Sequence, residues 1–166
     1  MRARRLVTGV VMLFCTAVLA GQGRPDFTGT WLEDEGQRKT PYATVSSGGG
    51  SRAASGKDVP LVIAQAAESL AIERNFIEHV RHVHHFDGRE DKNRNGAQVH
   101  TTRTKWEGAK LVTEGITFQS TNQGETYWKL REVRWLTAKG ELAVETTRTD
   151  EDGAVRTVHQ VYRRQR

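Results

Sequence analysis

The amino-acid sequence predicts an all-β fold, an antiparallel up-and-down meander that closes into a barrel of eight or nine strands. From Pro60 to the C-terminus, short segments rich in β-branched and aromatic residues follow one another, which is typical of strands. Glycine-containing pairs such as Asn95-Gly96 and Asp152-Gly153 separate them, and glycine supplies the positive φ of tight hairpin turns. The sequence shows no long amphipathic helix. Closure into a barrel would remove the exposed edges of so wide a sheet.

The chain of 166 residues begins with a segment that has the layout of a secretory signal peptide. Three arginines precede an apolar run over residues 6–19, which ends in small residues near Ala20. This run is shorter than the roughly 20 residues that a membrane-spanning helix needs. We therefore expect residues 1–20 to be removed on export. Residues 21–166 would then form a single domain without a membrane span, in the periplasm or outside the cell.

The charge of the chain lies partly in this leader. The whole sequence has 25 basic and 20 acidic residues, and three of the basic residues lie within residues 1–20. The remaining charges of both signs are interleaved, whereas a nucleic-acid-binding face needs a sustained basic stripe. The sequence therefore indicates no nucleic-acid partner. The single cysteine, Cys15, also lies in the leader, so the domain has no thiol for catalysis or for metal binding.

The first predicted strand covers residues 27–33, and a Gly/Ser-rich segment at about residues 34–59 follows it as a flexible loop. Eight further strands are predicted at residues 60–66, 69–75, 77–86, 98–106, 109–118, 126–136, 140–148 and 154–163. Residues 91–96 match the first half of a calcium-binding loop, but Thr102 stands where such a loop has its bidentate glutamate. We therefore interpret residues 91–96 as a hairpin loop.

Three short motifs resemble a known superfamily. Phe27-Thr28-Gly29-Thr30-Trp31 is similar to the opening strand of the calycins, which include the lipocalins and the fatty-acid-binding proteins. Trp106-Glu107-Gly108 resembles a turn of the fatty-acid-binding barrels, and Val158 to Arg164 resembles their closing strand. The whole chain looks like a small secreted bacterial protein of lipocalin-like character with no assigned activity. The resemblance implies a lipocalin-like barrel with Trp31 packed across its closed end.

The sequence departs from the fatty-acid-binding proteins in two respects. Those proteins hold a ligand carboxylate with an Arg-x-Tyr unit, where this chain has Gln160-Val161-Tyr162. They also cover the barrel mouth with two helices, where this chain has the Gly/Ser-rich segment. A fatty acid is therefore not implied as the ligand, although the barrel is.

Strand alternation gives a set of inward-facing candidates, which either fill the core or line a pocket for a small apolar or amphipathic molecule. They are Phe27, Trp31, Leu70, Ile72, Trp106, Val112, Ile116, Phe118, Trp128, Leu130, Val144 and Tyr162. The ligand-binding candidates are Trp31, Trp106, Trp128, Arg148, Gln160 and Tyr162, with the tryptophans supplying flat apolar surface and the polar members orienting the polar end of a ligand. The sequence thus favours a non-catalytic binding protein for a small, largely apolar molecule. A structural protein with a filled barrel is an alternative.

A cluster of histidines gives a second alternative. His82 and His84 are two residues apart on one predicted strand and therefore project from one face, and His100 lies in the next predicted strand. Together they could hold a zinc ion, although the spacing shows no carboxylate partner to orient the imidazoles. No nucleophile, phosphate-binding or metalloprotease motif occurs, so the sequence indicates neither an enzyme nor a resident cofactor.

Overall fold

The computed structural model describes residues 23–37, 39, 59–75 and 79–166. The leader and residues 40–58 of the Gly/Ser-rich segment lie outside these residues. The described chain forms one sheet of ten antiparallel strands and a short 3-10 helix. The elements are β1 (Gly29–Glu33), η1 (Glu35–Gln37), β2 (Leu61–Gln65), β3 (Ser69–Asn75), β4 (His79–His85), β5 (Glu90–Asn95), β6 (Gln98–Glu107), β7 (Lys110–Thr121), β8 (Gly124–Leu136), β9 (Leu142–Asp150) and β10 (Val155–Arg164). The all-β meander predicted from the sequence is confirmed.

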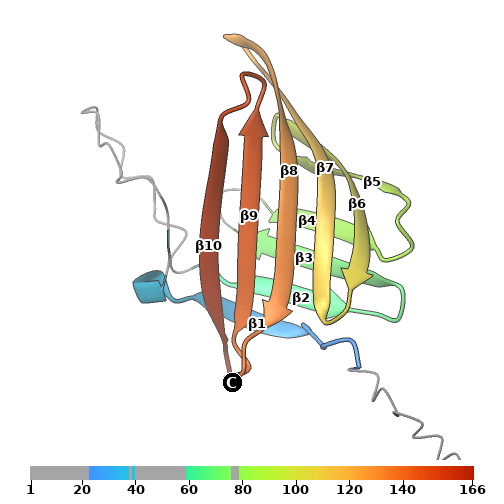
Figure 1. Cartoon of the computed structure of the whole chain (residues 1–166), viewed down its shortest axis with the longest axis vertical. Coiled ribbons are helices and arrows are strands. Elements are labelled where there is room, and N and C mark those ends of the chain that lie inside the picture. The colour runs from blue at the N-terminus through green and yellow to red at the C-terminus, as the bar shows by residue number, and fades with distance from the viewer. Residues whose placement is uncertain (1–22, 38, 40–58, 76–78) are drawn as a thin grey trace, which may run out of the picture.

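The first and last strands join the two halves of the sheet. The strand order is β4-β3-β2-β1-β10-β9-β8-β7-β6-β5, so consecutive strands are neighbours except where β1 pairs with β10. In that pair Trp31 lies opposite Arg164. Figure 1 shows β7 to β10 running side by side, with β1 to β4 crossing behind them. The sheet therefore curls into a nearly closed barrel.

A seam between β4 and β5 completes the wall, and side chains bridge it. Asn93 accepts a hydrogen bond from Val83 N at 2.8 Å and donates one to Val83 O at 2.9 Å. Asp91 accepts a hydrogen bond from His85 N at 2.7 Å, and its other carboxylate oxygen lies 2.6 Å from His85 Nδ1. The backbone groups of β4 thus hydrogen-bond to side chains of β5, where strands within a sheet would pair through their backbones.

The apolar core lies at one end of the barrel, where β1, β2 and β3 meet the ends of the later strands. Its buried members are Phe27, Trp31, Leu61, Ile63, Leu70, Ile72, Leu111, Leu142, Val144 and Tyr162. Trp31 is fully buried, and its Nε1 donates a hydrogen bond to Phe27 O at 2.9 Å. Arg164 covers the Trp31 ring at 4.6 Å and donates to Asp26 O at 3.2 Å. Trp31 is therefore a fixed part of the packed core.

Two details differ from the sequence-based expectation. Residues 91–96 were expected as a loop, but Glu90–Asn95 is strand β5, so the sheet has ten strands instead of nine. Ile116 and Phe118 were expected inside, but the fully buried residues of this stretch are Thr113 and Thr117, while Ile116 is 51% exposed. Neighbouring residues of a strand face opposite sides, so the threonines take the interior and Ile116 and Phe118 take the outer face.

Gly115 allows β6 and β7 to approach closely. It lies opposite Thr102, and a Cβ atom added at position 115 would overlap Thr101 O and lie 2.7 Å from the Cα atom of Thr102. Any larger residue would push the two strands apart at the level of the buried threonines.

Candidate functional site

The interior beyond the apolar core is lined by polar side chains. Four threonines of β6 and β7 are almost completely buried: Thr102, Thr104, Thr113 and Thr117. Thr104 and Thr113 lie opposite each other and share a hydrogen bond of 2.9 Å between their hydroxyl oxygens. Within the described chain, the Thr102 hydroxyl has no hydrogen-bond partner. Threonine has the shape of valine but carries a donor and an acceptor, so this wall can hydrogen-bond a polar guest.

Arg134 of β8 is the most unusual of these side chains. It lies between Leu111 of β7 and Val144 of β9 in the sheet register, and it is only 6% exposed. Its Nη2 contacts a carboxylate oxygen of Glu132. Among the described residues, nothing accepts a hydrogen bond from Arg134 Nε or Nη1. A buried guanidinium with two unused donor nitrogens is costly unless something pairs with them.

A second arginine strengthens the positive potential around Arg134. Burial, and to a lesser extent the charge of Arg74, lower the pKa of Arg134 to about 10, while Tyr162 acts in the opposite direction. Arg74 donates a hydrogen bond from Nη2 to the Tyr162 hydroxyl at 3.0 Å. Arg134 therefore remains protonated at neutral pH. Arg74 is exposed, and it meets the Tyr162 hydroxyl at the edge of the apolar core, from where its charge acts on Arg134.

Three histidines border this polar interior. The rings of His82 and His100 lie 5.2 Å apart, and those of His82 and His84 lie 6.3 Å apart. His100 Nδ1 is 2.8 Å from the Thr117 hydroxyl, and His84 Nδ1 is 3.5 Å from the Thr104 hydroxyl. His82 Nε2 is buried and has no hydrogen-bond partner in the part of the chain that the structure describes. The structure thus brings His82, His84 and His100 close together.

Burial keeps these histidines neutral. Burial, together with the nearby His100, lowers the pKa of His82 to about 4, while a hydrogen bond to the backbone of Arg94 opposes the change. Burial also lowers the pKa of His84 well below its ordinary value, as it does more modestly for His100. In the described ranges, no group of three or more histidine, cysteine or acidic side chains is placed to hold a metal ion.

The six ligand-binding candidates from the sequence are divided among three places. Trp31 lies in the apolar core, and Tyr162 lies at its boundary beside Arg74. Gln160 is half-buried on β10, opposite Val144. The structure therefore brings Tyr162 to the polar interior and places Trp31 away from it, in the packed core.

The other three candidates make contacts with protein side chains. The ring of Trp106 stacks on Phe27 at 5.6 Å, and its Nε1 is buried without a partner in the described chain. Arg148 lies over the Trp128 ring at 3.8 Å and pairs with Asp150 at 2.6 Å. Arg148 is thus engaged with Trp128 and Asp150.

Sequence reasoning missed Arg134 and Arg74, although a signal for each was present. Arg134 has the same strand parity as Trp128 and Leu130, which were expected to face inward, and Arg74 has the parity of Leu70 and Ile72. The charged candidate predicted from the sequence is Arg148, and neither Arg134 nor Arg74 is among the candidates.

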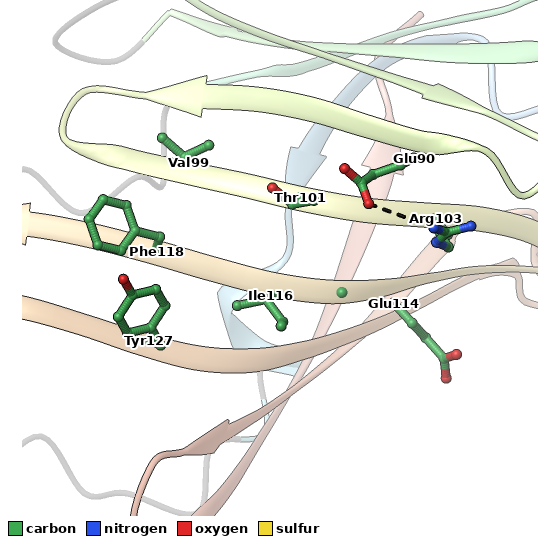
Figure 2. Close-up of a pocket in the computed structure, with 9 residues that line it drawn as sticks. Glu90, Val99, Thr101, Arg103, Glu114, Ile116, Phe118 and Tyr127 are labelled. Atoms are coloured by element: carbon green, nitrogen blue, oxygen red, sulfur yellow. Dashed lines mark ion pairs between the residues drawn. The ribbon is translucent and has the colours of Figure 1, made fainter.

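A hollow lies on the face of the sheet opposite the buried threonines. It measures about 420 Å³ and is lined by Glu90, Val99, Thr101, Arg103, Glu114, Gly115, Ile116, Phe118 and Tyr127. Figure 2 shows Ile116, Phe118 and Tyr127 along its floor and the ion pair of Glu90 with Arg103 beside them. Tyr127 is 45% exposed, so this hollow is an open surface groove, unlike the buried surroundings of Arg134.

The chain matches no protein-family model and no curated protein sequence. Across the described residues, there is no helix with the length and apolar character needed to cross a membrane.

Proposed function

We propose that the protein is a non-catalytic binding protein that acts after export and holds a small amphipathic molecule inside its barrel. The apolar body of this molecule would lie against the core, and an anionic group would face Arg134. The main support for this proposal is the buried Arg134 guanidinium. Two of its donor nitrogens have no hydrogen-bond partner among the described residues.

The charge of the surroundings supports an anion over a cation or a neutral group. Arg134 and Arg74 are both positive, and Glu132 is the carboxylate that contacts Arg134. An anion at Arg134 would gain charge-assisted hydrogen bonds in a region of low dielectric, and the charge of the exposed Arg74 would add to the attraction. A cation would face repulsion there, and a neutral molecule would leave part of the desolvation cost of Arg134 uncompensated.

The neighbouring core supports an apolar body for the ligand. Leu111 and Val144 flank Arg134, and Tyr162 presents a hydroxyl at the same boundary. Binding sites for small molecules commonly combine a largely apolar lining with a few polar groups that fix the orientation.

The proposal is tested with 1-naphthalenesulfonate, a permanently anionic probe, and with the neutral 1-naphthalenesulfonamide. We expect the sulfonate to bind the exported domain more tightly than the sulfonamide at pH 7.5. Arg134→Gln should weaken sulfonate binding by about tenfold or more, because a hydrogen bond to a charged group contributes roughly 1.5–3 kcal/mol.

The matched control is Arg131→Gln on the same strand. The Arg131 side chain is 44% exposed and pairs with Glu114 at 2.9 Å, so its loss should leave sulfonate affinity unchanged. Equal affinities for the two probes, or equal effects of the two substitutions, would contradict the proposal. Near-ultraviolet circular dichroism establishes that each variant is folded.

A further inference from the structure

The histidines are placed where a bound anion would change their charge. His82 comes from β4 and His100 from β6, on the two sides of the β4–β5 seam, and their rings are 5.2 Å apart. His82 Nε2 is buried without a partner in the described residues, so this nitrogen is available to take a proton. The positive charge of Arg134 acts on both His82 and His84.

The groups around His82 explain why it is neutral when the site is empty. Its ring lies 6.3 Å from that of His84 on the same strand and 5.2 Å from that of His100 on β6. The charges of Arg134 on β8 and Arg74 on β3 also act on it, and it hydrogen-bonds to the backbone of Arg94 on β5. On β5, the carboxylate of Asp91 is held by His85. On β8, Glu132 is held by Arg134, and on β10 the Tyr162 hydroxyl is held by Arg74. The charges that act on His82 are therefore positive, and burial adds to their effect.

We propose that the interior site takes up its anionic ligand together with a proton, which His82 accepts. This inference rests on the proposed function. An anion held by Arg134 would offset the two guanidinium charges and would stabilise a protonated His82 beside it. The proton and the ligand would thus bind cooperatively, and each would increase the affinity for the other.

The linkage has a definite direction. His82 is neutral in the empty protein down to a pKa of about 4. A bound anion raises this pKa, so between the two values the complex holds a proton that the empty protein does not. Ligand affinity then rises as the pH falls, by up to about tenfold per pH unit for one linked proton. A protein of this kind captures its ligand in acid and releases it toward neutral pH.

Isothermal titration calorimetry with 1-naphthalenesulfonate tests the inference, because the sulfonate does not itself titrate in this range. Titrations at pH 5.5 in two buffers of different ionisation enthalpy give the number of protons taken up per sulfonate bound. We expect about half a proton or more for the wild-type chain and close to none for His82→Gln. His79→Gln is the matched control on the same strand, since its side chain is 57% exposed, and its proton uptake should equal that of the wild type.

The outcomes separate this inference from the proposed function. Sulfonate binding that depends on Arg134 but takes up no proton would overturn the inference and leave the proposed function standing. Proton uptake that persists in His82→Gln would overturn the assignment to His82. A failure of the sulfonate to bind at either pH 5.5 or pH 7.5 would overturn both. The wild-type measurement needs no variant, so a folding defect of His82→Gln does not remove the test.

Discussion

Acid should destabilise the empty protein through His82, and the size of the effect follows from its surroundings. An unfolded histidine protonates near its ordinary pKa of 6.5, whereas burial holds the pKa of His82 in the folded chain at about 4. Between these values the unfolded chain binds more protons than the folded chain, so protonation favours unfolding. The stability is complete above pH 6.5 and is lost progressively as the pH falls toward 4.

The expected magnitude is about 1–2 kcal/mol between pH 7 and pH 5, after a discount for the partial exposure of His82 to solvent. Urea unfolding followed by tryptophan fluorescence, at pH 7, 6 and 5, gives the free energy of unfolding at each pH. His82→Gln removes the titrating group, so its stability should fall by about 1–2 kcal/mol less than that of the wild type over this range. His79→Gln should keep the wild-type dependence. The same pH dependence in His82→Gln and in the wild type would refute this reasoning.

Three further expectations concern the barrel wall and the histidines. Gly115→Ala should lower the free energy of unfolding in urea by about 3 kcal/mol, because the added methyl group meets the backbone of β6. Gly23→Ala is the control and should have little effect, because its added carbon meets nothing within 4 Å. Equal losses of stability in the two variants would contradict the close approach of β6 and β7 at Gly115. Asn93→Ala should lower the free energy of unfolding by about 1–3 kcal/mol, because Val83 N and O lose their hydrogen bonds between β4 and β5. Asn95→Ala, at the exposed end of β5, is the control. An equally large loss of stability in Asn95→Ala would show that the hydrogen bonds between β4 and β5 contribute little. Differential scanning fluorimetry tests the zinc alternative. We expect zinc to leave the melting temperature unchanged, because no group of metal-binding side chains is suitably placed among the described residues. A zinc-dependent rise in melting temperature that the double substitution His82→Ala/His84→Ala abolishes would contradict this expectation.

Local turn chemistry allowed most of the fold to be predicted from the sequence. Gly96 and Gly108 both have positive φ and end the hairpins that Asn95-Gly96 and Glu107-Gly108 had indicated. Strand β5 could not be found in this way, because Asp91 and Asn93 resemble loop residues when the sequence is read alone. Their polar side chains serve the seam to β4, which is a contact between segments that no local pattern reveals.

The interior was harder to predict because it departs from the rule that apolar side chains face inward. Thr113 and Thr117 take the inner face of β7, so Ile116 and Phe118 lie outside, which is the reverse of the expectation. Arg134 shares the strand parity of Trp128 and Leu130, but charged residues are seldom fully buried, so local rules do not predict a buried guanidinium at this position. Such conflicts between local rules and the fold are found most often where a protein binds something.

A crystal structure of residues 21–166 with 1-naphthalenesulfonate tests the central claim most directly. We expect the sulfonate oxygens within hydrogen-bond distance of Arg134 Nε and Nη1, with the naphthalene ring against Leu111 and Val144. A sulfonate bound only in the outer groove beside Ile116 and Tyr127, with the interior around Arg134 unchanged, would contradict the claim.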